Sequence, residues 1–290
     1  MLKKIKKKIK YFIYDIYLWL NTFSIFNKIF KKVFDIHLIS KGYCLDWDYL
    51  KSKSNNHIFQ GENLFIGKLS KLNIKYFYDV GANIGDYSNE ILKIPNTNVV
   101  AIEPLKKCYI ELLKIKKKYP DRFTALNVAL SNTKKKDFIY FANDQSELAS
   151  IEKKINKIDF FKNYNSNKKI IRINTLDNIF KKNKTKKIDF LKIDTEGNEK
   201  KVLEGSLKLI KKKIIKIIQI EFNLHHLTTN DTIFKITNYL KNYLVFQLNL
   251  INGRLLKVNH ADPLANLYYL SNFIFIEKDF YKNNSSIIHS

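Results

Sequence analysis

Short apolar runs alternate with lysine-faced amphipathic segments from about residue 74 onward. The apolar runs are typical of buried strands, and we expect strands at 74–80, 99–102, 123–130, 188–193, 214–222, 244–250 and 267–276. Between them, apolar residues at three- and four-residue steps predict helices at 86–93, 105–119, 198–212 and 231–242. Strand–helix alternation favours an α/β fold, a mostly parallel sheet with helices on both faces.

Two regions depart from this alternation. Residues 132–187 are expected to hold a hairpin, formed by 138–141 and 169–173, and a short helix that starts near Thr175. Residues 1–60 precede the alternating pattern, and we interpret them as a helical extension of a domain that spans 61–290.

The first 33 residues combine a strong positive charge with helical periodicity. They hold nine lysines against Asp15 alone. Apolar residues recur at helical steps at positions 5, 9, 12, 13, 16 and 20, which predicts an amphipathic helix. The apolar stretch is too short to span a bilayer, and no cleavage site follows it. Two placements stay open: residues 1–38 contact an anionic membrane surface, or the helix packs against the main domain.

The overall charge is a weak indicator of a nucleic-acid partner. The formal net charge is +25, but 49 of the 52 cations are lysines, while base readout favours arginine. Lys, Ile, Asn, Phe and Tyr are enriched together, as AT-rich codons alone would produce. A nucleic-acid partner is therefore not favoured. The two cysteines, Cys44 and Cys108, indicate a reducing compartment, so we expect a cytoplasmic protein, with peripheral contact at the inner face of the membrane as one option.

A glycine loop follows the first strand, with the sequence Asp79-Val80-Gly81-Ala82-Asn83-Ile84-Gly85. Gly81 permits a tight turn, Asn83 tolerates a left-handed conformation, and Gly85 lets the next helix approach a ligand closely. Amides at the helix start suit a carboxylate, and Asp79 suits an ammonium group. This pattern predicts a site for an amino-acid zwitterion.

The second strand ends at Glu103-Pro104, twenty-four residues after Asp79. An acidic side chain at this position typically accepts hydrogen bonds from the two hydroxyls of a ribose. A zwitterion site beside a ribose site describes S-adenosylmethionine (SAM) as the cofactor.

Further polar residues end the fourth and fifth strands. Asp194 and Glu196 follow one strand, while Glu221 and Asn223 end the next, with His225 and His226 just beyond. Removal of a proton from an acceptor hydroxyl needs a general base or a metal. The base candidates are His226, His225, Glu196 and Asp194. The metal alternative is Mg²⁺ bound by Asp194, Glu221 and Asn223, because oxygen ligands suit that ion.

Six segments resemble the FkbM family of SAM-dependent methyltransferases. They are YDVGANIGDYS (78–88), AIEP (101–104), NVALS (127–131), TLDNI (175–179), DFLKIDTEGNEKKVLEGS (189–206) and IEFN (220–223). The resemblance spans roughly residues 74–276 and implies a Rossmann-like class I methyltransferase with a seven-stranded sheet. Carried over by position, it implies that the cofactor is bound by Asp79, Gly81, Asn83, Gly85, Glu103, Pro104, Asn127, Ala129 and Asp194.

The resemblance also implies O-methylation of a hydroxyl. We expect a sugar of a bacterial surface glycan, such as a capsule or lipopolysaccharide, as the acceptor. The alternatives are methylation of another small molecule or of nucleic acid, and a non-catalytic membrane or polyanion adaptor that keeps the SAM fold. The acceptor atom and the oligomeric state do not follow from the sequence.

Overall fold

The computed structural model describes residues 9–10, 12–13, 15–16, 20, 24–45, 47–52, 58–143, 146–158, 167–182 and 185–289. Their core is a mostly parallel sheet with strand order β10-β9-β11-β8-β7-β1-β2-β3. The expected α/β fold class is confirmed, and the sheet gains a short eighth strand, β10, at one edge. The strands are β1 Tyr76–Val80, β2 Asn98–Ile102, β3 Phe123–Leu126, β7 Ile188–Ile193, β8 Ile215–Phe222, β9 Tyr243–Leu248, β10 Leu255–Lys257 and β11 Ser271–Glu277.

The strand order reverses between β1 and β7. The chain builds outward from β1 through β2 to β3, and then returns to the other side of β1 as β7 and β8, all in parallel. Ligands of such sheets bind beyond the carboxyl ends of the strands at this point. Both flanking strands are buried, so the sheet fixes the two loops that leave it.

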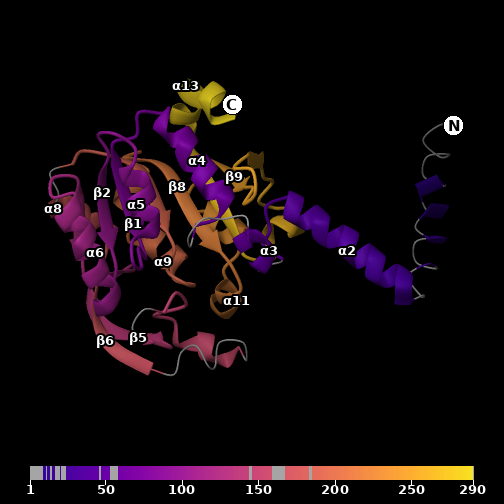
Figure 1. Cartoon of the computed structure of the whole chain (residues 1–290), viewed down its shortest axis with the longest axis horizontal. Helices are drawn as coiled ribbons and strands as arrows, with labels where there is room; N and C mark the ends of the chain where they lie inside the picture. The colour runs from indigo at the N-terminus through magenta and orange to yellow at the C-terminus, as the bar shows by residue number, and fades with distance from the viewer. Residues whose placement is uncertain are drawn as a thin grey trace.

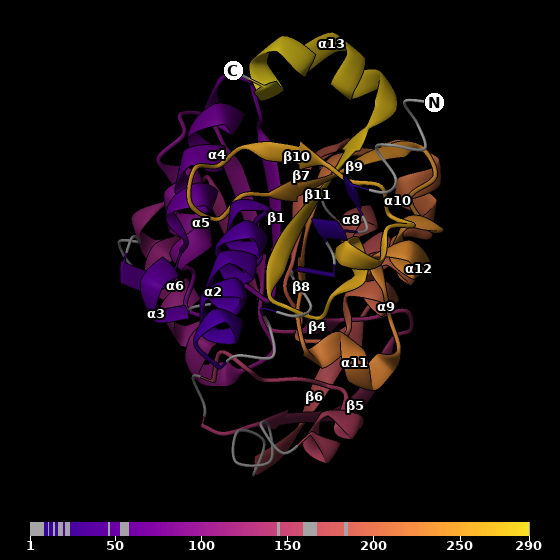
Figure 2. The ribbon, with the colours of Figure 1, turned by 90° about the vertical axis from the view of Figure 1, so that its right-hand side faces the viewer.

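Helices cover both faces of the sheet (Figure 2). On one face, side chains from α4, α5, α6 and α13 pack with Phe77, Phe190 and Ile274. On the other face, α8, α9, α10 and α12 pack with Tyr78, Leu191 and Phe222. The helices are α4 Gln60–Ser70, α5 Asp86–Leu92, α6 Lys106–Lys118, α8 Leu176–Lys182, α9 Glu199–Glu204, α10 Leu207–Lys211, α11 His225–Thr229, α12 Ile233–Thr237 and α13 Lys278–His289.

The expected hairpin is confirmed and belongs to a second, three-stranded sheet. β5 (Lys135–Phe141) pairs antiparallel with β6 (Asn167–Asn174), and β6 pairs with β4 (Ala129–Leu130). The strand expected at 123–130 is therefore wrong as a single strand, because β3 and β4 belong to different sheets. The short 3-10 helix η1 (Lys153–Lys157) follows this hairpin's first strand.

Two helices are shorter than the segments over which the apolar spacing predicts them. The helix expected at 198–212 divides at Gly205, where an added Cβ would lie 2.1 Å from the carbonyl oxygen of Ser131. Asp177 Oδ1 and Oδ2 then accept hydrogen bonds from the first turn of α10. The helix expected at 231–242 is reduced to α12. The sequence patterns did not predict β10, α11, α13 or the 3-10 helix η2 (Pro263–Asn266).

Before α4 lie helical residues at 9–10, 12–13, 15–16 and 20, and then two labelled helices. They are α2 (Ser24–Ser40) and α3 (Trp47–Ser52), and α2 projects from the body of the molecule (Figure 1). In the expected N-terminal helix, residues 1–8, 11, 14, 17–19 and 21–23 lie outside the described residues. Within the described residues, no helix is long and apolar enough to cross a bilayer. The division at residue 60 stays a prediction, and Leu38, Leu50 and Ile58 already contribute buried side chains before it.

Candidate active site

A cavity of about 880 Å³ opens at the carboxyl ends of β1, β2, β7 and β8. It collects most of the residues that the sequence singles out: Asp79, Gly81, Asn83, Glu103, Pro104, Ala129, Asp194, Glu196, Glu221, Asn223 and His225. Gly85, Asn127 and His226 are not among the residues that line it. The acids at the ends of β1 and β2 thus face one space, as the glycine-loop interpretation requires.

Gly81 brings the first loop against the loop after β7. Its φ is 80°, and an added Cβ would lie 1.7 Å from the carbonyl oxygen of Asp194. The position therefore needs glycine for both its conformation and the close approach of two backbones. Asn83 has a φ of 46°, and its N–H donates to Glu103 Oε2 at 3.0 Å.

Gly85 packs against α6. Its φ of 93° starts α5, but an added Cβ would lie 2.4 Å from Ile115 Cδ1 and 2.7 Å from Leu112 Cδ2. Gly85 therefore lets α6 pack against the loop, and its expected role in the close approach of the helix to a ligand stays a prediction.

Asp79 is a fully buried carboxyl in the cavity wall. Ser88 Oγ donates to its Oδ2 at 2.7 Å. Among the described residues none donates a hydrogen bond to its Oδ1. Burial raises the pKa of Asp79, while the nearby Lys192 ammonium opposes that rise. The carboxyl thus has one oxygen available for a cationic donor that enters the cavity.

Glu103 is positioned by backbone amides. Leu105 N–H donates to its Oε1 at 2.7 Å, and Asn83 N–H holds Oε2. Burial raises the pKa of Glu103 to about 7, against the opposing effect of these hydrogen bonds. Asn127 supports this corner from outside the cavity, since its Nδ2 donates to the carbonyl oxygens of Glu103 and Pro104, each at 2.9 Å.

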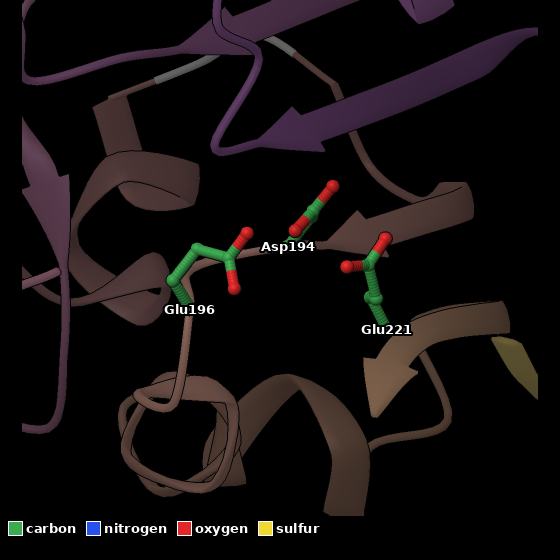
Figure 3. A group of neighbouring side chains, drawn as sticks. All are labelled: Asp194, Glu196 and Glu221. Carbon is green, nitrogen blue, oxygen red and sulfur yellow. The ribbon is translucent and has the colours of Figure 1, made fainter. Parts of the chain in front are cut away.

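Asp194, Glu196 and Glu221 gather at the other side of the cavity (Figure 3). Each offers a carboxylate oxygen, and these atoms all lie within 4.8 Å of one another. Burial raises the pKa of Asp194 to about 6, and burial with the neighbouring acids raises the pKa of Glu221 well above its usual range. Glu196 joins Asp194 and Glu221 in this group, and Asn223, the third metal ligand expected from the sequence, donates through Nδ2 to Glu196 and Glu221.

The two histidines have different surroundings. His225 lines the cavity, and its Nδ1 lies 2.8 Å from Glu196 Oε2. His226 lies behind it, with Nε2 3.0 Å from Glu199 Oε2 and its ring packed on Phe222. Both side chains belong to the first turn of α11, so consecutive residues point in different directions.

The model of the methyltransferase FkbM domain matches residues 79–247. The chain belongs to this family. The matched segment of the FkbM domain includes every strand end that contributes an acid to the cavity, from Asp79 to Glu221. The expected family is thereby confirmed, and with it the SAM-dependent methyltransferase fold.

Solved structures similar to the FkbM chain are methyltransferases of low sequence identity. Precorrin-6y C5,15-methyltransferase from Geobacter metallireducens GS-15 is 11% identical, with a TM-score of 0.36 over 77% of this chain and 93% of that chain. TrmK from M. capricolum, in complex with S-adenosylhomocysteine, is 13% identical, with a TM-score of 0.37 over 74% and 67%. The METTL16 methyltransferase domain is 13% identical, with a TM-score of 0.41 over 75% and 64%. No curated protein matches the chain.

Lys192 of the FkbM domain was not predicted as a site residue. Its side chain is buried in the cavity wall, and Nζ lies 2.6 Å from Asp194 Oδ2. Burial alone would lower the pKa of Lys192, but the carboxylates of Asp194, Asp79, Glu62 and Glu221 together raise it. In the sequence, Lys192 appears as a lysine within the mostly apolar run 188–193. The structure shows that all six residues of this strand, β7, are buried.

A polar network behind Lys192 was also missed. Glu62 Oε1 accepts from Gln219 Nε2 at 2.8 Å, and Gln219 Oε1 accepts from Tyr87 Oη at 2.8 Å. Glu62 comes from α4, before the matched segment, so the cavity of the FkbM domain includes a residue outside that segment.

Proposed function

We propose that this FkbM domain is a SAM-dependent O-methyltransferase and that its acceptor is a hydroxyl of a sugar in a bacterial surface glycan. The observation that carries the proposal is the His225–Glu196 pair, 2.8 Å apart, in the wall of the same cavity as Asp79 and Glu103. An aliphatic hydroxyl is a poor nucleophile until a base removes its proton, and this pair is suited to that task.

The residues at the β1 and β2 ends fit SAM. The Asp79 carboxyl, with one buried oxygen that has no donor within the described part of the chain, suits an ammonium group. Gly81, Ala82 and Asn83 of the glycine loop line the cavity beside Asp79, where the carboxylate of SAM would lie. Glu103, with Pro104 and Ala129 beside it in the lining, suits the ribose and the base. When bound, SAM supplies an electrophilic methyl group.

The cavity walls then hold and activate the acceptor. Glu196 orients the His225 imidazole through Nδ1, as a carboxylate does in other enzymes where it accepts a hydrogen bond from a catalytic histidine. Asn223 donates to Glu196 and so fixes the carboxylate in turn. We assign the base to His225 with Glu196, rather than to His226, because His226 is not among the lining residues. Asp194, with its pKa raised to about 6, remains the other candidate.

A divalent cation is the alternative way to activate the hydroxyl. The oxygen atoms of Asp194, Glu196 and Glu221 suit Mg²⁺, with Asn223 positioned to orient two of these carboxylates. Mg²⁺ would lower the pKa of a hydroxyl that it binds. Activity that survives thorough chelation, and does not rise with added Mg²⁺, would exclude this route. Full loss on chelation with recovery in Mg²⁺ would exclude a base acting alone.

The charge of the cavity supports an acceptor without phosphate near the reacting hydroxyl. In a chain of net charge +25, the described lining contains a single lysine, Lys192, and many acids: Glu62, Asp79, Asp86, Glu103, Glu147, Asp194, Glu196 and Glu221. Such a wall attracts a sulfonium and repels phosphate groups. It therefore favours a neutral sugar over nucleic acid. Tyr268 and Tyr269 also line the cavity and offer flat apolar surfaces beside hydroxyl groups.

The test is methyl transfer from labelled SAM to a panel of nucleotide sugars, lipid-linked glycans and RNA. We expect label in a sugar fraction, and a loss of turnover of about 100-fold or more in Glu196→Gln and His225→Gln while SAM still binds in calorimetry. Glu111→Gln, at a half-buried position of α6 that does not line the cavity, is the control and should keep full turnover. Label in RNA alone would overturn the sugar assignment, and failure to bind SAM would favour a non-catalytic adaptor. We place the enzyme in the cytoplasm at the inner membrane face.

A further inference from the structure

α2 has an exposed apolar face. Ile25, Ile29, Val33 and Ile36 are 65%, 51%, 59% and 63% exposed, and their spacing puts them on one side of the helix. We call these four residues the α2 apolar face. Figure 1 shows that α2 projects away from the sheet and its covering helices. Large aliphatic side chains in a contiguous exposed row mark a surface that contacts a partner.

Lysines flank this face. Lys28 and Lys32 lie beside it on the helix and are exposed, and Lys31 lies further round. Asp35 is the only acid in α2. A second copy of the helix would bring these lysines against one another, whereas an anionic lipid surface would pair with them. The charge therefore favours a bilayer as the occupant. Exposed Ile9, Phe12, Ile13 and Ile16 continue the apolar character toward the N-terminus.

The end of α2 is tied to the wall of the cavity. Leu38 is buried, Asn249 Nδ2 donates to the Ser40 carbonyl at 2.9 Å, and Cys44 N–H donates to the Leu270 carbonyl at 2.7 Å. Cys44 and Leu270 both line the cavity. The helix is thus connected to one rim of the site through only a few residues.

We infer that the α2 apolar face docks on an anionic bilayer and that the acceptor is anchored in the same bilayer. The docking stands on the face and its lysines alone, while the acceptor assignment rests on the proposed methyl transfer to a glycan. An acceptor held in the membrane reaches the rim formed by Cys44 and Leu270 without leaving its lipid. The class of substrate is then a lipid-linked glycan rather than a free nucleotide sugar.

The docking test uses the full chain and vesicles of phosphatidylglycerol and phosphatidylcholine. We expect flotation with vesicles that contain phosphatidylglycerol and much weaker flotation with phosphatidylcholine alone. Ile29→Asp/Val33→Asp should weaken vesicle binding at least about tenfold, through lost apolar burial and charge repulsion. The matched control is Ile110→Asp/Leu113→Asp, which adds the same charges at exposed apolar positions of α6 and should bind as the wild type does.

Equal flotation of the α2 variant and the wild type would overturn the docking. A dimer in solution that the α2 variant converts to monomer, without vesicle binding, would assign the face to a second copy instead.

The acceptor is tested with labelled SAM and the lipid fraction of the source cells in the same vesicles. The wild type should label lipid at least about tenfold faster than the α2 variant, with equal affinity for SAM. Label only in water-soluble sugars would overturn the lipid-linked acceptor, whereas absence of SAM binding would fail the proposed function and leave the docking intact.

Discussion

Asp79 is held in a state that favours ligand binding over stability. Its carboxyl is buried with Oδ1 unpaired among the described residues, which is unfavourable for the free protein. We expect Asp79→Asn to weaken SAM binding about 10–100-fold, since a hydrogen bond to a charged group contributes about 1.5–3 kcal/mol. The free energy of unfolding should stay the same or rise. Calorimetry and urea unfolding measure the two effects, and a joint loss of binding and stability would indicate that Asp79 is structural instead.

Lys192 balances the acids around it. Its Nζ lies 2.6 Å from Asp194 Oδ2, and its charge opposes the rise that burial causes in the pKa values of Asp194 and Glu221. Removal of one member of a buried ion pair costs about 3–5 kcal/mol, so Lys192→Met should lower the free energy of unfolding by that amount. Asp194→Asn added to Lys192→Met should restore at least half of the loss. Simple additivity in the double-mutant cycle would contradict this coupling.

The residues at strand ends were predictable, and the residues inside strands were not. Asp79, Glu103 and Asp194 follow apolar runs, and in a parallel sheet those ends meet at one edge. Lys192 lies within the buried strand β7 and Glu62 within the helix α4. In the sequence, a charged residue at such a position only interrupts the apolar pattern and does not indicate a site. The choice between His225 and His226 depended on α11, a helix of five residues with no periodic signal. Only the three-dimensional contacts separate the two.

Secondary elements followed their sequence patterns where packing agreed with them. β1, β2, β7 and β8 were predictable because strands buried on both faces are mostly apolar. The strand at 123–130 fails because the Asn127 side chain bonds to the Glu103 and Pro104 carbonyls, and the chain changes sheets there. Neither that bond nor the contact of Gly205 with Ser131 is local, so periodicity could not reveal them.

The contact between the β1 and β7 loops can be tested with two glycines. Gly81→Ala places a Cβ 1.7 Å from the Asp194 carbonyl oxygen at a φ of 80°, which should cost at least about 3 kcal/mol and abolish SAM binding. Gly67 lies in α4 with no atom within 4 Å of an added Cβ. Gly67→Ala should therefore raise the free energy of unfolding by about 0.5–1 kcal/mol. If Gly81→Ala and Gly67→Ala change the melting temperature equally, the proposed role of the contact between the β1 and β7 loops is contradicted.

The molecule separates its charges. The net charge of +25 comes with a cavity wall that is rich in acids and contains Lys192 as its single lysine among the described lining. The exposed lysines of α2 face outward on a projecting helix. Composition alone therefore misleads about the site, because the average over the chain has the opposite sign to the cavity. This separation of charge would let one chain bind both the cationic cofactor and the anionic bilayer that we propose.

Stability and cofactor binding should respond to pH in opposite directions. Burial raises the pKa of Glu103 from 4.5 to about 7, so the folded state binds a proton there more tightly than the unfolded chain does. The free energy of unfolding should then fall as the pH rises from about 4.5 to 7, by about 3 kcal/mol from this group. In the proposed ribose site, SAM binds the ionised carboxylate more tightly, so its stabilising shift in melting temperature should grow over the same range. Glu103→Gln should reduce the pH dependence of the free energy of unfolding and that of the shift in melting temperature caused by SAM. Thermal melts with and without SAM from pH 5 to 8 measure these two slopes. If the slopes of the variant match those of the wild type, other groups carry the effect, and Glu103 does not bind the ribose as proposed.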